Sequence, residues 1–252
     1  MSVALLEAAW PSPTTVRAVC TLRGGGVSAV PYDSLNLGAH VGDDPQAVAE
    51  NRRRVAAALA LPAAPLWLQQ VHGAEVLDAD SAAAHGAVLP AADAACTRQP
   101  GRVLAILVAD CMPVLFASDS GDCIAAAHAG WRGLAGGVLE ATVAAMRREP
   151  RRLQAWLGPA IGPRHFEVGA EVRDAFLAHD AAAAAAFTAN ERGRWQCDLE
   201  LLARQRLQAL GLTRIGAAAL CTHAAPQRCY SYRRDGRTGR MAALIWMPAV
   251  LE

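Results

Sequence analysis

Two uninterrupted apolar runs of strand length lie in the middle of the chain and constrain its fold more than any other feature. They cover Val103–Ala109 and Cys123–Ala127. Continuous apolar runs of this length predict buried strands. The first run stops at Asp110-Cys111 and the second at His128-Ala-Gly, where turn residues follow. Because a sheet holds the residues at its strand ends rigidly, these polar side chains are candidates for function.

Helices and further strands are mixed along the rest of the chain. Asp44-Pro45 predicts a helix start, because Asp is a good N-cap and Pro fits the first helical position. Asp198 is expected to cap a helix that runs to Leu210, and Ala181–Ala186 is helical by propensity. The other predicted helices are Trp131–Arg148 and Glu171–His179; the other predicted strands are Val16–Leu22, Leu66–Gln70, Ala74–Leu77, Pro113–Ser118, Leu153–Leu157 and Arg214–Cys221.

The C-terminal segment is predicted to form a β-hairpin, with strands at 230–233 and 240–246 joined across Asp235-Gly236. Several adjacent strands with interspersed helices favour the α+β (mixed α/β) class, with a mixed-sheet β-sandwich core flanked by helices. The chain of 252 residues contains no repeat and no clear linker. Residues 1–252 are therefore expected to form a single compact domain.

Composition excludes several classes of function. A net charge of +1 argues against an electrostatic nucleic-acid binder. All 24 basic residues are Arg, so no lysine is present to form a Schiff base. The seven cysteines are scattered and form no close pair, which favours free thiols in a reducing compartment. The N-terminus has no basic region and no apolar run could span a bilayer, so a cytoplasmic location without membrane contact is expected.

Three residues at predicted strand ends could hold a metal ion. His72 precedes a glycine between two short strands, Cys111 follows one apolar run, and His128 ends the other. Imidazole and thiolate are good zinc ligands, and three protein ligands leave one coordination position for water or substrate. The wide spacing alone is weak evidence, since a single His at a strand end is commonly a capped polar group and a single Cys a small buried apolar residue.

The segment His128-Ala-Gly-Trp-Arg-Gly133 has a second property, because a strand, a glycine turn and a helix N-terminus together point backbone N–H groups at an anion. Gly130 and Arg132 are therefore candidate contacts for a phosphate or carboxylate. A tight turn with a solvated arginine explains the same pattern. Arg23-Gly-Gly-Gly is equally open to both interpretations, since glycine loops are mostly flexible turns.

Seven short motifs occur in order along nearly the whole chain, and together they resemble the YfiH-type laccase-domain family, whose members are called multicopper polyphenol oxidases or purine nucleoside phosphorylases. The motifs are Arg23-Gly-Gly-Gly-Val-Ser28, Leu35-Asn-Leu-Gly-Ala-His-Val-Gly-Asp-Asp-Pro45, Gln69-Gln-Val-His-Gly73, Ala109-Asp-Cys-Met-Pro-Val114, His128-Ala-Gly-Trp-Arg-Gly133, Gly158-Pro-Ala-Ile-Gly162 and Tyr230-Ser-Tyr-Arg-Arg-Asp-Gly-Arg-Thr-Gly-Arg240. The resemblance implies a zinc site at His72, Cys111 and His128 in a compact α/β domain. Ala95-Cys96, where bulkier aliphatic residues are expected, departs mildly from the pattern.

The first hypothesis for the reaction is zinc-dependent phosphorolysis of purine nucleosides, namely adenosine, inosine and methylthioadenosine, with adenosine deamination as a side activity. Phosphate would bind at Gly130 and Arg132, and Cys111 would act with the metal. Asp110 is a candidate proton carrier or a partner that orients Cys111. Arg23 and Asn36 are candidate substrate contacts. The expected partners are small molecules only, and the chain is expected to be a monomer or small homo-oligomer.

Three alternatives remain open from the sequence. A copper-dependent polyphenol oxidase needs many histidines, but the chain has seven and no His-x-His pair; copper in the same site in vitro could still give weak oxidation. A metal-dependent hydrolase that edits a peptidoglycan precursor would use the same ligands, or Cys111 as a nucleophile. A structural-zinc interaction module would need four ligands, usually in close Cys pairs, and this pattern is absent.

Overall fold

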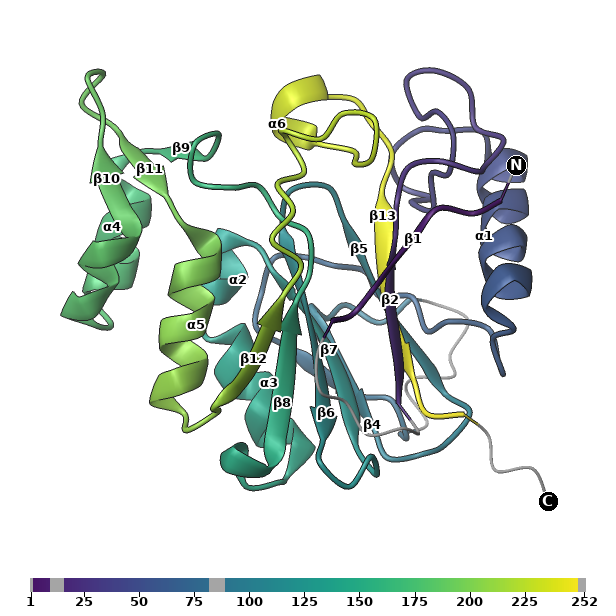
Figure 1. Cartoon of the computed structure of the whole chain (residues 1–252), viewed down its shortest axis with the longest axis horizontal. Helices are drawn as coiled ribbons and strands as arrows, with labels where there is room; N and C mark the ends of the chain where they lie inside the picture. Colours follow the sequence, from purple (N-terminus) through teal and green to yellow (C-terminus); the bar gives the residue numbers. More distant parts are fainter. Residues whose placement is uncertain (1, 10–15, 82–88, 249–252) are drawn as a thin grey trace.

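The two apolar runs form strands of two different sheets, which pack face to face in the centre of the molecule (Figure 1). A computed structural model describes residues 2–9, 16–81 and 89–248. The first run becomes β5 (Val103–Val108) and the second contributes to β7 (Ile124–Ala129). Every residue of both strands is buried, as expected for sheets that are covered on both faces.

The larger sheet has six strands in the order β12-β8-β6-β7-β4-β3. It is mixed, because β12 pairs parallel to β8 and β3 parallel to β4, whereas the three inner pairs are antiparallel. The bounds not yet given are β3 Val76–Asp78, β4 Ala94–Thr97, β6 Met112–Ser118, β8 Leu153–Leu157 and β12 Arg214–Ala217.

The smaller central sheet has four antiparallel strands in the order β1-β2-β13-β5. Its other strands are β1 (Leu5–Glu7), β2 (Arg17–Thr21) and β13 (Met241–Trp246). The C-terminal strand β13 lies between β2 and β5, so the sheet joins the two ends of the chain to its middle. The prediction of a mixed-sheet sandwich in an α+β protein is confirmed.

Helices cover the outer faces of both sheets and complete four layers (Figure 1). Helix α1 (Pro45–Leu59) packs Val55 against the four-stranded sheet. Buried helix residues such as Leu139 and Leu202 pack against the outer face of the six-stranded sheet. The covering helices are α2 Trp131–Ala135, α3 Val138–Met146 and α5 Leu199–Ala209. Helix α4 (Ala170–Leu177) lies farther out and packs against α2, β9 (Glu167–Val168) and β11 (Trp195–Cys197) (Figure 1).

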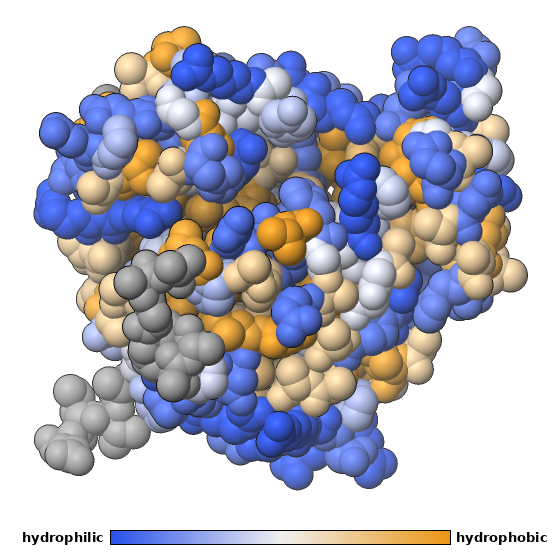
Figure 2. All heavy atoms as spheres, turned by 180° about the vertical axis from the view of Figure 1, so that it is seen from behind, coloured by the Kyte–Doolittle hydropathy of each residue, from blue (hydrophilic) through white to orange (hydrophobic). Residues whose placement is uncertain are grey.

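A smaller unit beside α4 projects from the sandwich (Figure 1). It contains a three-stranded sheet in the order β10-β11-β9. The bounds are β9 Glu167–Val168, β10 Phe187–Ala189 and β11 Trp195–Cys197, with the 3-10 helices Pro150–Arg152 and Ala181–Ala186 also outside the two large sheets. Seen from behind, hydrophobic residues lie in separate groups among hydrophilic ones (Figure 2). Among the described residues, no helix is long and apolar enough to cross a membrane.

Both predicted helix caps are confirmed, since Asp44 accepts a hydrogen bond from the Gln46 N–H and Asp198 accepts one from the Leu201 N–H. The prediction of one helix over 131–148 is wrong. Gly136 and Gly137 separate α2 from α3, and Gly137 has a φ of 92°, a conformation that glycine adopts without strain.

The predicted C-terminal hairpin is also wrong. Its first half is the short helix α6 (Tyr232–Asp235), which begins because the Ser231 hydroxyl accepts a hydrogen bond from the Arg234 N–H. Strand β13 then pairs with β2 and β5 rather than with its chain neighbour. Of the two short strands predicted around His72, the first contributes only isolated bridges at Leu66 and Gln69, and the second begins at Val76.

The interior between the sheets offers a direct stability test. Leu115 is fully buried there, whereas Leu89 is 52% exposed. We expect Leu115→Ala to lower the free energy of unfolding by about 2–5 kcal/mol, because it leaves a cavity among rigid strands. The matched change Leu89→Ala should alter it by no more than about 0.5 kcal/mol. Denaturant titrations of both variants measure the difference, and equal effects would contradict the assigned core.

Candidate metal centre

Three side chains from different parts of the chain meet at one end of the central sheets. His72 lies in the loop before β3, Cys111 directly precedes β6, and His128 lies in β7. Their ligand atoms all lie within 4.8 Å of one another, and Cys111 Sγ is 3.8 Å from His72 Nε2. Among the described residues, no other group of three or more His, Cys, Asp and Glu side chains has a metal-binding arrangement.

Strand pairing explains why these residues converge. Pro113 in β6 pairs with His128 in β7, so Cys111, two residues earlier, lies at the same end of the sheet. The His72 loop is joined to β5 by Gln70, whose side-chain amide donates to the Leu107 carbonyl and accepts from the Leu107 N–H, both at 2.8 Å. Gln70 therefore extends the pairing pattern of β5 to the loop that carries His72.

A buried carboxylate organises the same loop. Asp93 is fully buried and accepts hydrogen bonds from the backbone N–H groups of Val71, His72 and Gly73. It also lies 2.8 Å from Nδ1 of His128. Because Nδ1 of His128 is engaged by Asp93, Nε2 is left to face the centre, which is the usual arrangement of a metal-ligating histidine.

The three residues fit a metal ion by donor type and by spacing. Two imidazoles and a thiolate suit zinc or copper, and ligand atoms around a tetrahedral zinc lie about 3.5 Å apart. The observed separations of 3.8 to 4.8 Å need only a small contraction. Gly130 makes room for this arrangement, because a Cβ at that position would lie 2.8 Å from Cys111 Sγ. A side chain larger than hydrogen would therefore push the thiol out of place.

Charges within the cluster favour the ligand form of the cysteine. Burial raises the pKa of the Cys111 thiol, but attraction to His128 and hydrogen bonds with His128 and His72 outweigh it and lower the pKa to about 6. For His128, burial lowers the pKa, while Cys111 and Asp93 together raise it to about 9. Burial also opposes ionisation of Asp93, yet its bonds from His128, Gly73 and Val71 lower its pKa.

The three ligands line a pocket of about 410 Å³. Four of its polar lining residues were not identified as site residues from the sequence: His40, Gln70, Tyr232 and Arg240. All four stand in motifs that carry the family resemblance, which was the available signal. Asp93 was also missed, although a single acid in the alanine-rich run 91–95 is a recognisable sign of a buried carboxylate that needs partners.

Asp110 is buried, and its carboxylate faces the protein rather than the pocket. It accepts hydrogen bonds from the hydroxyls of Thr222 and Ser231 and from the Arg233 N–H. Its backbone has a φ of 91°, which is unusual for a residue other than glycine. None of these contacts involves Cys111, so the role of Asp110 as a partner that orients Cys111 stays a prediction. The same contacts offer no support for proton transfer, because both carboxylate oxygens are already engaged.

The other predicted substrate contacts lie outside the pocket lining, except that Gly130 touches the cluster itself. Arg23 forms an ion pair with Asp33 and lies over the Tyr230 ring. Asn36 is fully buried, and its side chain bonds within the chain. Arg132 is exposed and stacks on Trp131. Direct contact of these three residues with substrate stays a prediction.

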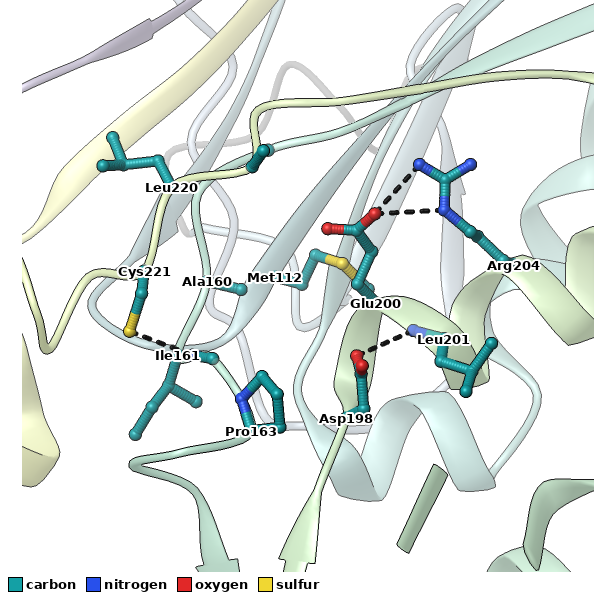
Figure 3. Close-up of a pocket in the computed structure, with 13 residues that line it drawn as sticks. Met112, Ala160, Ile161, Pro163, Asp198, Glu200, Leu201, Arg204, Leu220 and Cys221 are labelled. Carbon is teal, nitrogen blue, oxygen red and sulfur yellow. Dashed lines mark hydrogen bonds and ion pairs between the residues drawn. The ribbon is translucent and has the colours of Figure 1, made fainter. Parts of the chain in front are cut away.

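A second cleft of about 420 Å³ lies between the 158–163 loop and the start of α5 (Figure 3). Its charged residues are engaged with one another or with the backbone: Glu200 pairs with Arg204, and Asp198 caps the helix. Cys221 there accepts a hydrogen bond from the Gly162 N–H. The cleft thus contains no group of ligands comparable to His72, Cys111 and His128 within the described residues.

Fold and site together define a class of protein: a four-layer α+β sandwich with a two-histidine, one-cysteine centre that can hold a metal ion. Comparison with known proteins identifies the family. Residues 17–248 match the family described as multi-copper polyphenol oxidoreductase laccase, and the chain belongs to this family.

Relatives at high identity carry the name purine nucleoside phosphorylase. One from Pseudomonas aeruginosa is 53% identical over 94% of this chain and 96% of its own length. The protein YfiH of Escherichia coli, with the same name, is 51% identical over 96% of this chain and 98% of its own length. The crystal structure of Neisseria meningitidis protein NMB0706 superposes with a TM-score of 0.92 at 46% identity, covering 97% of this chain and 99% of that one.

The role of Asp93 can be tested by Asp93→Asn. An amide presents one acceptor oxygen instead of two and places an NH₂ group against N–H donors, so the loop and His128 lose their common anchor. We expect zinc, used as the probe ion, to bind about 10–100-fold more weakly in a chelator competition. Asp122→Asn, which alters a surface pair with Arg148, is the control and should leave zinc affinity unchanged. Equal affinity in both variants would refute the orienting role.

Proposed function

We propose that this protein is a zinc-dependent purine nucleoside phosphorylase that acts on adenosine, inosine and methylthioadenosine, with adenosine deamination as a second activity. The observation that carries the proposal is the convergence of His72, Cys111 and His128 on one pocket, in a chain that is about half identical to proteins named purine nucleoside phosphorylase. Because all seven cysteines are free thiols, we place the protein in the reducing cytoplasm.

The residues around the centre support a reaction in which the protein positions reactants. His72, Cys111 and His128 would hold the ion, and Asp93 would keep the two histidines in register. When bound there, zinc would supply Lewis-acid stabilisation of negative charge in the pocket. Tyr232 is 62% exposed at the pocket, where its ring could stack on a purine.

Phosphorolysis balances without a base from the protein. An oxygen of hydrogen phosphate forms a bond to C1′ of the ribose as the bond from C1′ to the purine nitrogen breaks, and the proton that the phosphate loses is taken up by the leaving purine. The described pocket lining contains His, Gln, Cys, Tyr and Arg but no Asp or Glu. Phosphate is already ionised at neutral pH, whereas water needs a general base before it attacks. An attacking phosphate therefore needs no carboxylate in the lining, which supports phosphorolysis.

Polyphenol oxidase activity is the weaker alternative despite the family description. A multicopper oxidase needs several copper centres supplied by many histidines. Among the described residues, one group of three potential ligands is present. Copper bound in this same group could produce slow oxidation in vitro, since copper binds such ligands more tightly than zinc.

The proposal is tested by metal content and phosphate dependence measured on the same preparation. We expect about one zinc ion per chain, and release of hypoxanthine from inosine only when phosphate is present, with ribose 1-phosphate as the second product. Cys111→Ser should remove most of the metal and lower kcat/KM by at least about a hundredfold, because a hydroxyl is a poor zinc ligand at neutral pH. Cys229→Ser, at a buried cysteine outside the pocket, is the control.

Two results would contradict the proposal. Hypoxanthine release at the same rate without phosphate would make the enzyme a hydrolase. Full activity of a metal-free Cys111→Ser preparation would separate the reaction from the metal centre altogether.

A further inference from the structure

One cation in the pocket wall has no anionic partner among the described residues. Arg240 precedes β13 and lines the same pocket as the metal ligands. The side-chain contacts of its guanidinium are two hydrogen bonds from Nη1 to backbone carbonyls and a position 5.9 Å from the Tyr232 ring centre. A cation that is partly removed from water and lacks a carboxylate is costly unless a ligand supplies the negative charge.

The surrounding chain fixes the position of Arg240. Its backbone N–H donates to Oδ1 of the buried Asn36 at 2.8 Å. Gly38 lies so close to its stem that a Cβ there would be 2.8 Å from Cγ of Arg240. Nη1 donates to the carbonyls of Thr238 and Gly239, both at 3.0 Å. The planar guanidinium is therefore held from one side.

The other side of the fork is available for a ligand. Within the described part of the chain, Nε and Nη2 of Arg240 have no hydrogen-bond partner. Two neighbouring N–H groups of a guanidinium match two oxygens of a phosphate, which is the geometry of bidentate recognition. An arginine oriented in advance binds such a ligand without the entropic cost of ordering a free side chain.

The local potential favours an anion. Burial lowers the pKa of the Arg240 guanidinium, which reflects incomplete solvation of its charge. His40 lines the same pocket, and its pKa is lowered by burial and by the positive charges of Arg240 and Arg52. The negative charges of Cys111 and Asp110 partly offset the effect of burial on the pKa of Arg240, but neither group forms an ion pair with it. Cys111 is engaged with His72 and His128, and the carboxylate of Asp110 is engaged by Thr222, Ser231 and the Arg233 N–H.

The turn after β7 is the competing position for an anion, and the structure makes it a poor one. Helix α2 has five residues, so few aligned peptide dipoles contribute at its start. The Arg132 side chain is exposed and lies 4.5 Å from the Trp131 ring centre, outside the pocket lining.

We propose that Arg240 is the phosphate-binding residue of the pocket, with Nε and Nη2 donating to two oxygens of the phosphate that attacks the nucleoside. The inference rests on the proposed phosphorylase function and identifies where its second substrate binds. The same pair of donors would hold the phosphate of the sugar phosphate product.

The test compares Arg240→Gln and Arg240→Lys with Arg233→Gln in zinc-loaded enzyme of measured metal content. Arg233 is a matched control in the same segment, since its guanidinium bonds to the Glu167 carbonyl and lies outside the pocket lining. We expect Arg240→Gln to raise the KM for phosphate at least about tenfold and the KM for inosine by less than about threefold. Arg240→Lys should be intermediate, because it keeps the charge but loses the fork.

Equilibrium binding of inorganic phosphate, measured by calorimetry without nucleoside, supplies a readout that does not depend on turnover. Arg240→Gln should bind at least about tenfold more weakly than the wild type, and Arg233→Gln should bind equally well. A wild type that binds phosphate through Arg240 but does not use it in catalysis would refute the proposed function alone. Unchanged phosphate affinity in Arg240→Gln, or a selective loss in Arg132→Gln instead, would overturn the assignment of Arg240.

Discussion

The carboxylate of Asp93 is the interaction on which the rest of the site depends. It is fully buried just before β4, and it binds the backbone of the His72 loop on one side and the imidazole of His128 on the other. A buried charge is tolerated only where several donors compensate it, and here three N–H groups and one imidazole do so. The cost of burying this charge enforces a fixed geometry, because any movement of the loop would leave the carboxylate unsatisfied.

One strained backbone position is the ligand His72 itself and another, Asp110, directly precedes the ligand Cys111; each is held by an aspartate. His72 has a φ of 61° and Asp110 a φ of 91°. Such conformations cost on the order of 1–3 kcal/mol each and persist where surrounding contacts determine them. Asp93 holds the backbone at His72 by accepting hydrogen bonds from N–H groups of the His72 loop. Asp110 holds its own backbone through its carboxylate, which accepts from Thr222, Ser231 and the Arg233 N–H. Both ligands are therefore fixed before any ion binds.

The sequence predicted those parts of the structure that depend on local pattern. The buried strands β5 and β7, the capped starts of α1 and α5, and the three candidate ligands at strand ends all follow from short segments. Asp93 and Gln70 were missed because their role depends on the pairing of distant segments, such as the contact of Gln70 with Leu107. The expected hairpin failed for the same reason, since β13 pairs with strands that are remote in the sequence.

The predicted anion site at Gly130 and Arg132 shows that a local sequence pattern can form as expected without placing its side chains in the pocket. A strand, a turn and a helix start do follow one another at His128, but Gly136 and Gly137 end the helix after five residues and Arg132 turns to Trp131. The position of Arg240 depends on the pairing of β13 with β2 and β5. This pairing places Arg240, the last residue of the C-terminal motif, in the pocket lining. A short stretch cannot reveal this, because the neighbours that orient Arg240, Asn36 and Gly38, lie some two hundred residues earlier.

The positions of the aspartates around the pocket bear on which kind of substrate the pocket can bind. Asp93 is hydrogen-bonded to the ligand His128, and Asp110 directly precedes the ligand Cys111. Their carboxylate oxygens nevertheless accept from backbone and side-chain donors, and neither residue is in the described pocket lining. A carboxylate in the lining would repel phosphate and would compete with it for Arg240. An attacking group that is already ionised needs neutralisation and alignment rather than deprotonation. The pocket is thus suited to an anionic second substrate because its acids are used to hold the ligands while its unpaired cation is left for the substrate.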